Sequence, residues 1–583
     1  MVYIWENRQL MKKSLLCLSL LASICVFAQD DPIFHWAKSV GAVGFDSAYD
    51  LISDASGNVY TVGSFNATVD FDPGSGTSNL TQAGSAPDGF IQKLDSQGNF
   101  VWAKRIGGNG GNGVFEIDFA ANGDLILAGS FFGTVDFDPN AGTFNMTSIP
   151  LANPTFSSTD VFVVRLTADG NFVWAKKVGG NDYDEVMDMK VDANGAIFVS
   201  GFFQGTCDFD PGTSNFALTS SGPRDAYMLK LDPDGNFIWA KRFGGASETR
   251  INAFDLDSQG NILATGNFFG AIDVDPSAAT VTLQPSPGDN FGQFSQDVLL
   301  LKLNPSGDYV WAGKIGGTMS EGCSAIGIGA DDSVFISGIF AGNSDMDPGS
   351  GQTILATNGN GGAVFLIKYN SSGQLQWAKQ TGTVFSPSVN NLQVTVSGKI
   401  LTGGNYNGNF AFATGFDLPT IGNEDMFIAR FDQSGTPEWV QSFGGSGEDV
   451  LQAFEYRESG IWNIAGSFNA TVDFDPFSSV QNLTSNGGHD IFTLKLAPES
   501  LKTSDFSTNE SWSVYPNPSS GNVNLHFDEV LFGSKVGIYT ILGQTIAEFQ
   551  IGQTEKNLNL KPGNYLIKIE NQSTSNTKKL IVL

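Results

Sequence analysis

The chain alternates short apolar runs with turn residues throughout residues 33–497. In one unit, Val114–Phe119 alternates apolar and polar positions, Leu125–Phe131 is continuously apolar, and Asp160–Leu166 and Phe172–Lys176 follow a longer loop. Asn-Gly and Gly-Asn pairs, which form tight hairpin turns, stand between these runs. Because no apolar residues recur at helical spacing, the pattern predicts four short strands per unit and an all-β fold.

The last strand of the unit carries Trp-Ala-Lys or a close variant, and this feature recurs along the chain. Its seven tryptophans are Trp36, Trp102, Trp174, Trp239, Trp311, Trp377 and Trp439. Neighbouring copies lie 62 to 72 residues apart. That spacing is too long for a helical solenoid repeat and suits a four-stranded propeller blade with one long loop.

The two ends of the repeat region predict how the ring closes. Ile33–Val40, which holds the first tryptophan, precedes any complete unit, and the last unit stops at Asp490–Leu496 without a tryptophan strand. Pairing these two segments leaves no open sheet edge. We therefore predict a seven-bladed β-propeller over residues 33–497, in which the N-terminal strand completes the seventh blade.

Two kinds of segment in this region resemble a known repeat. Gly444–Asp449, followed by an alternating strand, and Asp54–Gly63 are similar to the SBBP-type bacterial β-propeller repeat. The resemblance covers the repeat region. It implies a propeller and a surface or secreted habitat, and it implies no defined activity.

The N-terminus carries the pattern of a secretory signal. Met11-Lys12-Lys13 is followed by an apolar run, Leu15–Phe27, and by the small residue Ala28. This order predicts a signal peptide over residues 11–28. No other stretch approaches the roughly 18 uninterrupted apolar residues of a membrane helix, so we expect no membrane span.

The C-terminus has a separate pattern after a polar linker at residues 498–511. Its segments Val514–Gly521, Val536–Gly543, Leu560–Ile569 and Lys578–Val582 closely resemble the type A C-terminal sorting domain of the type IX secretion system of Bacteroidetes. The resemblance implies a small β-sandwich over residues 512–583, the type IX secretion machinery as partner, and a secreted or outer-surface protein. The alternative is a β-sandwich appendage without an export role.

The net charge limits the classes of partner, and the positions of the cysteines predict whether they form disulfides. The formal net charge is -29 and the pI is about 4.3, so nucleic acids and anionic lipids are disfavoured as partners. Cys17 and Cys25 leave with the signal peptide. Cys207 and Cys323 belong to non-adjacent units, so we expect buried free thiols.

Catalytic motifs are scarce. The three histidines, His35, His489 and His526, form no pattern of catalytic residues, and no nucleophile elbow, metalloprotease helix or phosphate loop occurs in a fitting context. The repeated tryptophans are expected to pack between sheets rather than to stack on sugars. We therefore predict a protein that is not an enzyme.

A first set of carboxylates recurs as Asp-x-Asp-Pro or a close variant. Its pairs are Asp70/Asp72, Asp136/Asp138, Asp208/Asp210, Asp273/Asp275, Asp345/Asp347 and Asp473/Asp475. Residues i and i+2 of an extended chain share a face, so each pair presents oxygen ligands suited to Ca²⁺. The alternative is a solvated strand end before a proline turn. The sixth unit replaces the pair with Phe410–Ala413, so the acids serve either solubility or an optional ion.

A second set of carboxylates lies in the loops that enter the innermost strands. It comprises Asp46, Asp184, Glu248, Glu321, Glu448 and Asp449. These loops are expected to ring one mouth of the central channel, where the acids would hold a cation or a cationic ligand. A solvated channel mouth is the alternative.

Together these features favour a secreted or cell-surface, non-enzymatic propeller that binds an extracellular glycan or protein. Two other functions stay open. One is a carbohydrate-active lyase or glycosidase that uses channel-mouth carboxylates, which requires two carboxyl groups about 5 to 10 Å apart. The other is a structural surface or adhesion component.

Overall fold

The structure is a computed structural model. It describes residues 31–151, 158–287, 295–357, 361–477, 479–498, 512–515, 519, 521–540, 544–570 and 575–582. The predicted signal peptide over residues 11–28 lies outside these residues. The chain divides into two compact units, Met1–Pro498 and Glu499–Leu583. None of the helices in the described ranges is long and apolar enough to cross a membrane.

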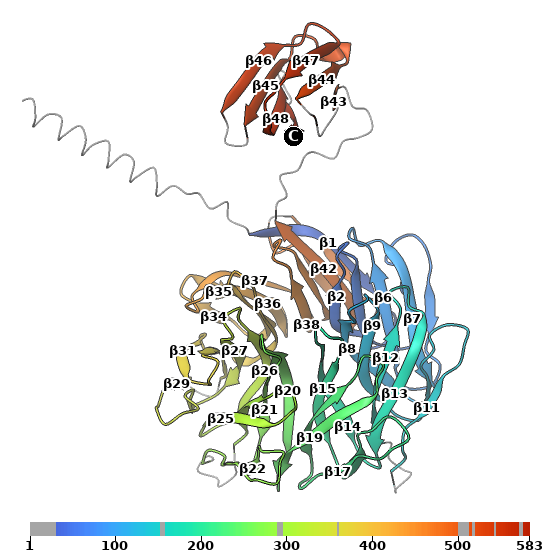
Figure 1. Ribbon diagram of the computed structural model, residues 1–583, viewed down its shortest axis with the longest axis vertical. Helices are drawn as coiled ribbons and strands as arrows, with labels where there is room; N and C mark the ends of the chain where they lie inside the picture. The colour runs from blue at the N-terminus through green and yellow to red at the C-terminus, as the bar shows by residue number, and fades with distance from the viewer. Residues whose placement is uncertain are drawn as a thin grey trace, which may run out of the picture. The chain divides into compact units, whose positions relative to one another are not determined.

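The first unit is a ring of seven antiparallel sheets, the blades, each built on four consecutive strands (Figure 1). Blade 1 contains β2 (Ser47–Ser53), β3 (Val59–Phe65), β6 (Asp88–Leu94) and β7 (Phe100–Gly108). Blade 2 contains β8 (Asn112–Phe119), β9 (Leu125–Phe131), β12 (Asp160–Leu166) and β13 (Phe172–Gly180). Blade 3 contains β14 (Asp184–Val191), β15 (Ile197–Phe203), β18 (Asp225–Leu231) and β19 (Phe237–Gly245).

The remaining blades repeat this order. Blade 4 contains β20 (Thr249–Leu256), β21 (Ile262–Phe268), β24 (Asp297–Leu303) and β25 (Tyr309–Gly317). Blade 5 contains β26 (Glu321–Ile328), β27 (Val334–Phe340), β30 (Ala363–Tyr369) and β31 (Leu375–Gln380). Blade 6 contains β32 (Phe385–Val394), β33 (Ile400–Asn407), β36 (Asp425–Phe431) and β37 (Pro437–Gly445). Blade 7 contains β38 (Asp449–Tyr456), β39 (Trp462–Phe468), β42 (Asp490–Pro498) and β1 (Pro32–Val40).

Blade 7 closes the ring by joining the two ends of the repeat region. β1 pairs antiparallel with β42, from Pro32 opposite Pro498 to Val40 opposite Ile491, so the blue and orange strands lie side by side in Figure 1. Seven apolar clusters fill the spaces between neighbouring blades, and the cluster between blades 7 and 1 contains Trp36 and Val40. The seven-bladed propeller closed by its N-terminal strand is thereby confirmed.

A two-stranded ribbon follows the second strand of every blade. The ribbons are β4 (Thr68–Asp70) with β5 (Asn79–Thr81), β10 (Thr134–Asp136) with β11 (Asn145–Thr147), β16 (Thr206–Asp208) with β17 (Ala217–Thr219), β22 (Ile272–Asp273) with β23 (Thr282–Leu283), β28 (Asn343–Asp345) with β29 (Ile354–Ala356), β34 (Phe410–Ala413) with β35 (Phe416–Leu418), and β40 (Thr471–Asp473) with β41 (Asn482–Thr484). Five of them also pair with the fourth strand of the preceding blade; for example, Asp136 of β10 lies opposite Gly107 of β7. The ribbon of one blade thus extends the sheet of its neighbour.

The repeated tryptophans fix neighbouring blades at the outer rim. A Cβ atom on Gly235, in the outer turn of blade 3, would lie 2.9 Å from Cη2 of Trp174 and 2.9 Å from Cγ of Lys176 in blade 2. Equivalent glycines at 98, 170, 307, 373 and 435 meet the tryptophan of the preceding blade in the same way. The tryptophans therefore pack between blades, as the sequence predicted.

This contact gives a matched pair of substitutions. Gly235 and Gly123 both have positive φ, 75° and 84°, but a Cβ on Gly123 would meet nothing within 4 Å. Backbone strain costs both alanine variants about 1–2 kcal/mol. We expect Gly235→Ala to cost about 1–3 kcal/mol more, because Trp174 must move. Urea unfolding of both variants measures the difference, and equal midpoints would remove the proposed role of the tryptophan contact.

The second unit is a small β-sandwich. Its three-stranded sheet contains β43 (Trp512–Tyr515), β44 (Asn522–Phe527) and β47 (Glu555–Asn559), and its four-stranded sheet contains β45 (Lys535–Thr540), β46 (Thr545–Gln550), β48 (Gly563–Glu570) and β49 (Ser575–Val582). A short 3-10 helix, η1 (Glu529–Leu531), precedes β45. One apolar cluster, with Trp512, Val536 and Leu580 among its members, forms the core of this unit.

Candidate functional site

The innermost strands of all seven blades surround a central cavity of about 490 Å³. Each of these strands carries a β-bulge, where one residue has no partner in the neighbouring second strand. The bulged residues are Tyr49, Phe115, Met187, Asn252, Ser324, Asn390 and Gln452. A bulge redirects side chains locally, and here it adds polar side chains to the channel wall.

The bulge explains a glycine in the second strand of the blades. A Cβ atom on Gly129 would lie 2.0 Å from the carbonyl oxygen of Gly113 in the facing strand. The same close approach occurs at glycines 63, 201, 266, 338, 404 and 466. The glycines therefore permit the bulges that shape the channel.

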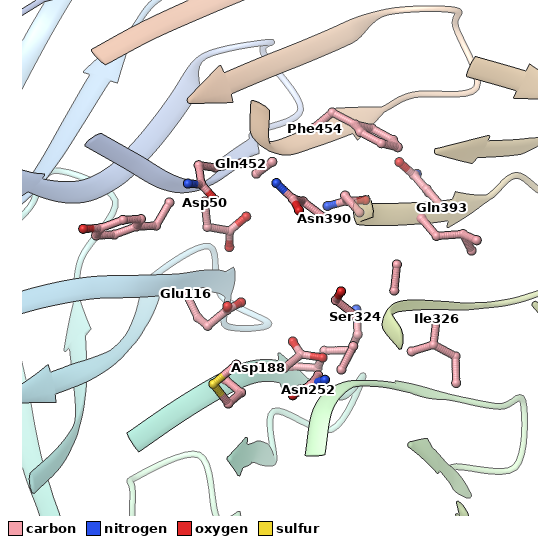
Figure 2. A pocket seen from close by; sticks show the side chains of 18 of the residues that line it. Asp50, Glu116, Asp188, Asn252, Ser324, Ile326, Asn390, Gln393, Gln452 and Phe454 are labelled. Carbon is pink, nitrogen blue, oxygen red and sulfur yellow. The ribbon is translucent and has the colours of Figure 1, made fainter. Parts of the chain in front are cut away.

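Carboxylates occupy the side of the channel formed by blades 1 to 3. Figure 2 shows Asp50, Glu116 and Asp188 on this side, around the cavity. Asp118 and Lys190 also line the cavity, and Lys190 Nζ lies 3.8 Å from the Asp255 carboxylate. Acids thus outnumber bases on this side.

Most of these acids bind the backbone of the next blade. Asp50 Oδ2 accepts a hydrogen bond from the Ile117 N–H at 3.0 Å. Asp118 Oδ2 accepts one from Val191 at 2.8 Å, and Asp188 Oδ2 accepts one from Phe254 at 2.7 Å. Among the described residues, the Glu116 carboxylate has no hydrogen-bond or ion-pair partner, and it is therefore the acid most available to a ligand.

Burial changes the protonation of this acidic side. Desolvation raises the pKa of Asp50 to about 7 and that of Asp188 to about 6. Desolvation, with the negative charges of Asp50 and Asp188, raises the pKa of Glu116 well above its usual range. The neighbouring Asp255 raises the pKa of Lys190. The channel therefore presents both protonated and ionised carboxyl groups near neutral pH.

Amides and a hydroxyl occupy the side formed by blades 4 to 6, and they also bridge to the next blade. Asn252 Nδ2 donates to the Cys323 carbonyl at 2.8 Å, and Ser324 Oγ donates to the Val389 carbonyl at 3.0 Å. Gln393 donates to the Tyr456 carbonyl and accepts from the Tyr456 N–H, both at 2.7 Å. These bonds hold the polar wall in place before any ligand arrives.

The Asp-x-Asp-Pro pairs lie on the ribbons, where the first aspartate of each pair organises the ribbon turn. Its Oδ1 accepts backbone N–H bonds from the residues two and eight positions later, at 2.7–3.2 Å. The residues with this bonding are Asp70, Asp136, Asp208, Asp273, Asp345 and Asp473. The residue between the two aspartates is buried; Phe71, for example, packs edge-on against Phe65 at 5.3 Å.

The second aspartate of each pair binds the turn that follows it. Its Oδ1 accepts a backbone N–H bond from the residue two positions later, at 2.8–3.0 Å. The residues with this bonding are Asp72, Asp138, Asp210, Asp275, Asp347 and Asp475. Asp475 is buried and the other five are half-buried, so these side chains are less solvated than a free strand end would be.

The sixth ribbon shows why these acids are dispensable there. β34 and β35 are joined by residues 414–415 alone, so this ribbon lacks the long loop whose N–H groups the acids bind elsewhere. Phe412 keeps the buried aromatic position, 5.3 Å from Phe427. The acids and the long loop are thus present together or absent together.

The aspartates of each pair form part of hydrogen-bonded turns. In each pair, Oδ1 of both aspartates accepts N–H bonds from its own turn. The described residues contain no group of three or more His, Cys, Asp or Glu side chains arranged for a metal ion. Calcium binding therefore stays a prediction for all of these residues: Asp70 and Asp72, Asp136 and Asp138, Asp208 and Asp210, Asp273 and Asp275, Asp345 and Asp347, and Asp473 and Asp475.

The predicted channel-mouth acids are not a solvent-facing ring. Asp46, Asp184, Glu321 and Asp449 are at most 1 % exposed. Their loops fold over them: the Ala42 N–H donates to Asp46 at 2.8 Å, and the Gly180 N–H donates to Asp184 at 2.6 Å. The Gly445 N–H donates to Asp449 at 2.6 Å, and Ser344 donates to Glu321.

The other two members of this set are more accessible. Glu248 is half-buried, and the Glu448 side chain is 60 % exposed, with its carboxylate 3.7 Å from His489 Nε2. A ligand role for the set stays a prediction, and the channel acids Asp50, Glu116 and Asp188 are the residues that sequence reasoning missed. The sequence signal that could have identified them is an acidic residue at the same position, directly after the bulged residue, in three successive innermost strands.

Comparison with known proteins concerns the two units separately. Residues 513–583 match the family described as the secretion system C-terminal sorting domain. This match confirms the predicted sorting domain. The sorting domain indicates that the protein is secreted or at the cell surface, and it implies an interaction with the type IX secretion machinery during export.

The repeat region is similar to curated proteins of low identity. An uncharacterized WD repeat-containing protein of Acanthamoeba polyphaga mimivirus is 21 % identical over 513 residues, covering 76 % of this chain and 37 % of the relative. The regulatory protein FlaEY of Caulobacter vibrioides is 25 % identical over 239 residues, covering 39 % of this chain and 23 % of the relative. The chain thus spans well under half the length of both relatives.

Solved structures give weaker likeness. PorZ, a surface component of the type IX secretion system of Porphyromonas gingivalis, is 11 % identical with a TM-score of 0.23, and the match covers 92 % of this chain and 81 % of PorZ. A gluconolactonase of Xanthomonas campestris is 10 % identical with a TM-score of 0.26, covering 65 % of this chain and 91 % of that protein.

Proposed function

We propose that this exported propeller is a non-enzymatic binding protein whose central channel takes the end of an extracellular glycan. The observation that carries the proposal is the channel wall, a cavity of about 490 Å³ with carboxyl groups on one side and amides on the other. That volume lies within the usual range of roughly 300–1,000 Å³ for small-ligand sites. Sugar hydroxyl groups both donate and accept hydrogen bonds, so they match such a mixed wall.

Preorganisation supports the same proposal. Asn252, Ser324 and Gln393 are already held by bonds to the next blade, so little side-chain entropy is lost when a ligand binds. Glu116 is the channel acid most available to accept from a ligand hydroxyl. We also assign the repeats to the SBBP type, because the turn and strand segments quoted above recur in the blades.

A substitution that fills the channel tests this function. Ser324 is exposed within the channel, so Ser324→Trp is expected to abolish binding on a glycan array while the protein still unfolds in one cooperative transition, with only the small loss of stability that follows from losing the hydrogen bond to Val389. The matched control is Val173→Trp, at a residue 44 % exposed on the outer strand β13. Loss of binding in both variants, or in neither, would contradict a channel site.

The acidic side also favours a second candidate function, a glycosidase. A carboxyl group with a raised pKa beside ionised carboxylates is typical of a general acid, and Glu116 has these neighbours. A reducing-sugar assay run beside the array separates the two functions. Turnover that Glu116→Gln abolishes would identify the enzyme; binding without turnover supports the binding protein.

A further inference from the structure

The interface between blades 5 and 6 departs from the other six interfaces at one position of its core. Four positions after the repeated tryptophan, the fourth strand of every other blade carries a buried apolar residue. These residues, each at most 5 % exposed, are Val40, Ile106, Val178, Phe243, Ile315 and Phe443. In blade 5 the same position holds Thr381, so this interface lacks apolar volume that most of the others have.

A cavity of about 210 Å³, the interblade cavity, lies at this interface. Its inner wall contains buried side chains: Val364, Leu366, Thr381, Phe412 and Phe431. Its outer end is lined by the exposed residues Lys379 and Thr436, so a ligand can enter from the rim of the propeller. A dry apolar cavity of about 150 Å³ accommodates benzene, so the interblade cavity has room for a ring with a short substituent.

The hydroxyl groups in the wall of the interblade cavity already have partners. Thr402 Oγ1 donates to the Asn391 carbonyl at 3.0 Å. Thr381 Oγ1 accepts from the Val364 N–H at 3.0 Å, and the Ser337 hydroxyl donates to a backbone carbonyl at 2.8 Å. Because these polar groups are satisfied within the protein, the inner wall favours an apolar group over water.

Three positions that are acidic at other interfaces are neutral at this one. Ala363 begins the third strand of blade 5, where the other six blades have a buried aspartate. The ribbon of blade 6 has Ala411 and Ala413 in place of an Asp-x-Asp pair. Thr436 stands where the outer turn of blade 4 has Asp308. None of the described residues that line the cavity is acidic, so an anion meets less repulsion here than elsewhere on this acidic protein.

Lys379 supplies a positive charge at the open end of the interblade cavity. Side chains alternate along a strand, so Lys379 shares with Thr381 the face of β31 that lies against blade 6. At the same position in blade 3, Lys241 Nζ lies 3.4 Å from Asp308 Oδ1. Among the described residues, Lys379 forms neither an ion pair nor a side-chain hydrogen bond. Its charge is therefore available to a ligand.

We propose that the interblade cavity binds a small carboxylate whose apolar body has about six to eight carbon atoms, such as an aromatic acid. The ring packs against Phe412 and Phe431, whose ring centroids lie 6.0 Å apart, and the carboxylate meets the Lys379 ammonium group at the open end. Such a ligand supplies the apolar volume that Thr381 leaves unfilled. The cavity shares no lining residue with the central channel, so the site is independent of glycan binding.

The test uses the full chain without its predicted signal peptide and three probes that differ in their polar end: phenylacetate, 2-phenylethanol and 2-phenylethylamine. Ligand-observed NMR at low ionic strength measures the three dissociation constants. Phenylacetate is expected to bind most tightly and the amine at least about fivefold more weakly, because Lys379 attracts the anion and repels the cation. Absence of phenylacetate binding, or equal binding of the anion and the amine, would overturn the proposal.

Two substitutions fill the cavity with residues that other blades carry at the same positions. Thr381→Ile reproduces Ile315 of blade 4, and Thr402→Leu reproduces Leu127 of blade 2. Each should weaken phenylacetate binding at least about tenfold. Thr381→Ile removes the acceptor of the Val364 N–H, so Thr402→Leu keeps the test decisive if the first variant fails to fold. Binding that survives in either folded variant would place the ligand elsewhere.

A substitution at the exposed Lys379 tests the charge. Lys379→Gln should weaken phenylacetate binding about three- to fivefold and leave 2-phenylethanol binding unchanged. Lys241→Gln, at the same strand position in blade 3, is the matched control and should change neither. Ser324→Trp, which fills the central channel, should also leave phenylacetate binding intact. Loss of binding in that variant, or an equal effect of the two lysine substitutions, would contradict the assignment to this cavity.

Discussion

A chain that begins at Gly41 is expected to lose the cooperative unfolding transition of the propeller, whereas a chain that begins at Asp31 keeps it. The first chain lacks β1, so β42 becomes an open edge and the cluster between blades 7 and 1 loses Trp36 and Val40. Truncating a single buried tryptophan costs about 3–5 kcal/mol, and here a whole strand is removed. Thermal unfolding followed by circular dichroism compares the two chains.

A synthetic peptide of residues 31–41 provides the control. Added in excess to the shortened chain, it should restore the transition by pairing with β42, because the strand itself and not the chain connection supplies the contacts. Equal melting temperatures for the two chains, with no effect of the peptide, would contradict closure by β1.

The propeller is expected to be more stable at pH 5.5 than at pH 8.5 when divalent cations are chelated. Burial raises the pKa of Asp184 and of Glu321 to about 8 and that of Asp490 to about 6. A raised folded-state pKa means that the folded state binds protons more tightly than the unfolded state. Stability from these groups is therefore fully present below their ordinary pKa of about 4, and it is lost progressively as the pH rises from there to the folded-state values of about 6 to 8.

Other carboxyl groups set the acid limit. Burial opposes the ionisation of Asp54, Asp232 and Asp432, but hydrogen bonds from their turn residues together outweigh it and lower the pKa of each below the usual 3.8. Their contribution to stability is therefore lost only below about pH 4.

The free energy of unfolding, measured with urea, should be lower at pH 8.5 than at pH 5.5 by at least about 3 kcal/mol. One pKa unit corresponds to about 1.4 kcal/mol for each group whose pKa is raised.

A matched variant assigns the pH effect to named groups. Asp184→Asn with Glu321→Gln removes two of the ionisations and should flatten the fall in stability between pH 6 and pH 8.5. A wild-type protein whose stability rises over this range would show that these carboxyl groups are ionised in the folded state.

The fold was predictable because its determinants are local and repeated. The Trp-Ala-Lys strand, the Asn-Gly turns and the unmatched strands at the two ends specify blade number and closure without knowledge of any contact. The Asp-x-Asp-Pro pairs are local in the same way. The partners of Asp136 are N–H groups two and eight residues later, so the sequence alone can indicate a role of the acids in a turn.

The channel was less predictable because it depends on closure of the ring. Asp50, Glu116 and Asp188 are about seventy residues apart in sequence and meet only when innermost strands from different blades surround one cavity. The burial of Asp46 and Asp449 depends on how each loop folds back over its own carboxylate, and a loop entering an innermost strand looks the same in sequence whether its acid points inward or outward.

The ribbons have a consequence for how such a ring changes during evolution. Since β10 of the second repeat completes the sheet of blade 1, a sheet and a sequence repeat are different units. Duplicating or deleting one whole repeat carries a ribbon along with its blade and leaves every junction complete. A single sheet cut out at its structural edges would carry the ribbon of the next repeat with it. The donor protein would then lack the ribbon of that next repeat, and the recipient protein would have one ribbon too many. Blades of this kind can therefore be exchanged as sequence repeats but not as single sheets.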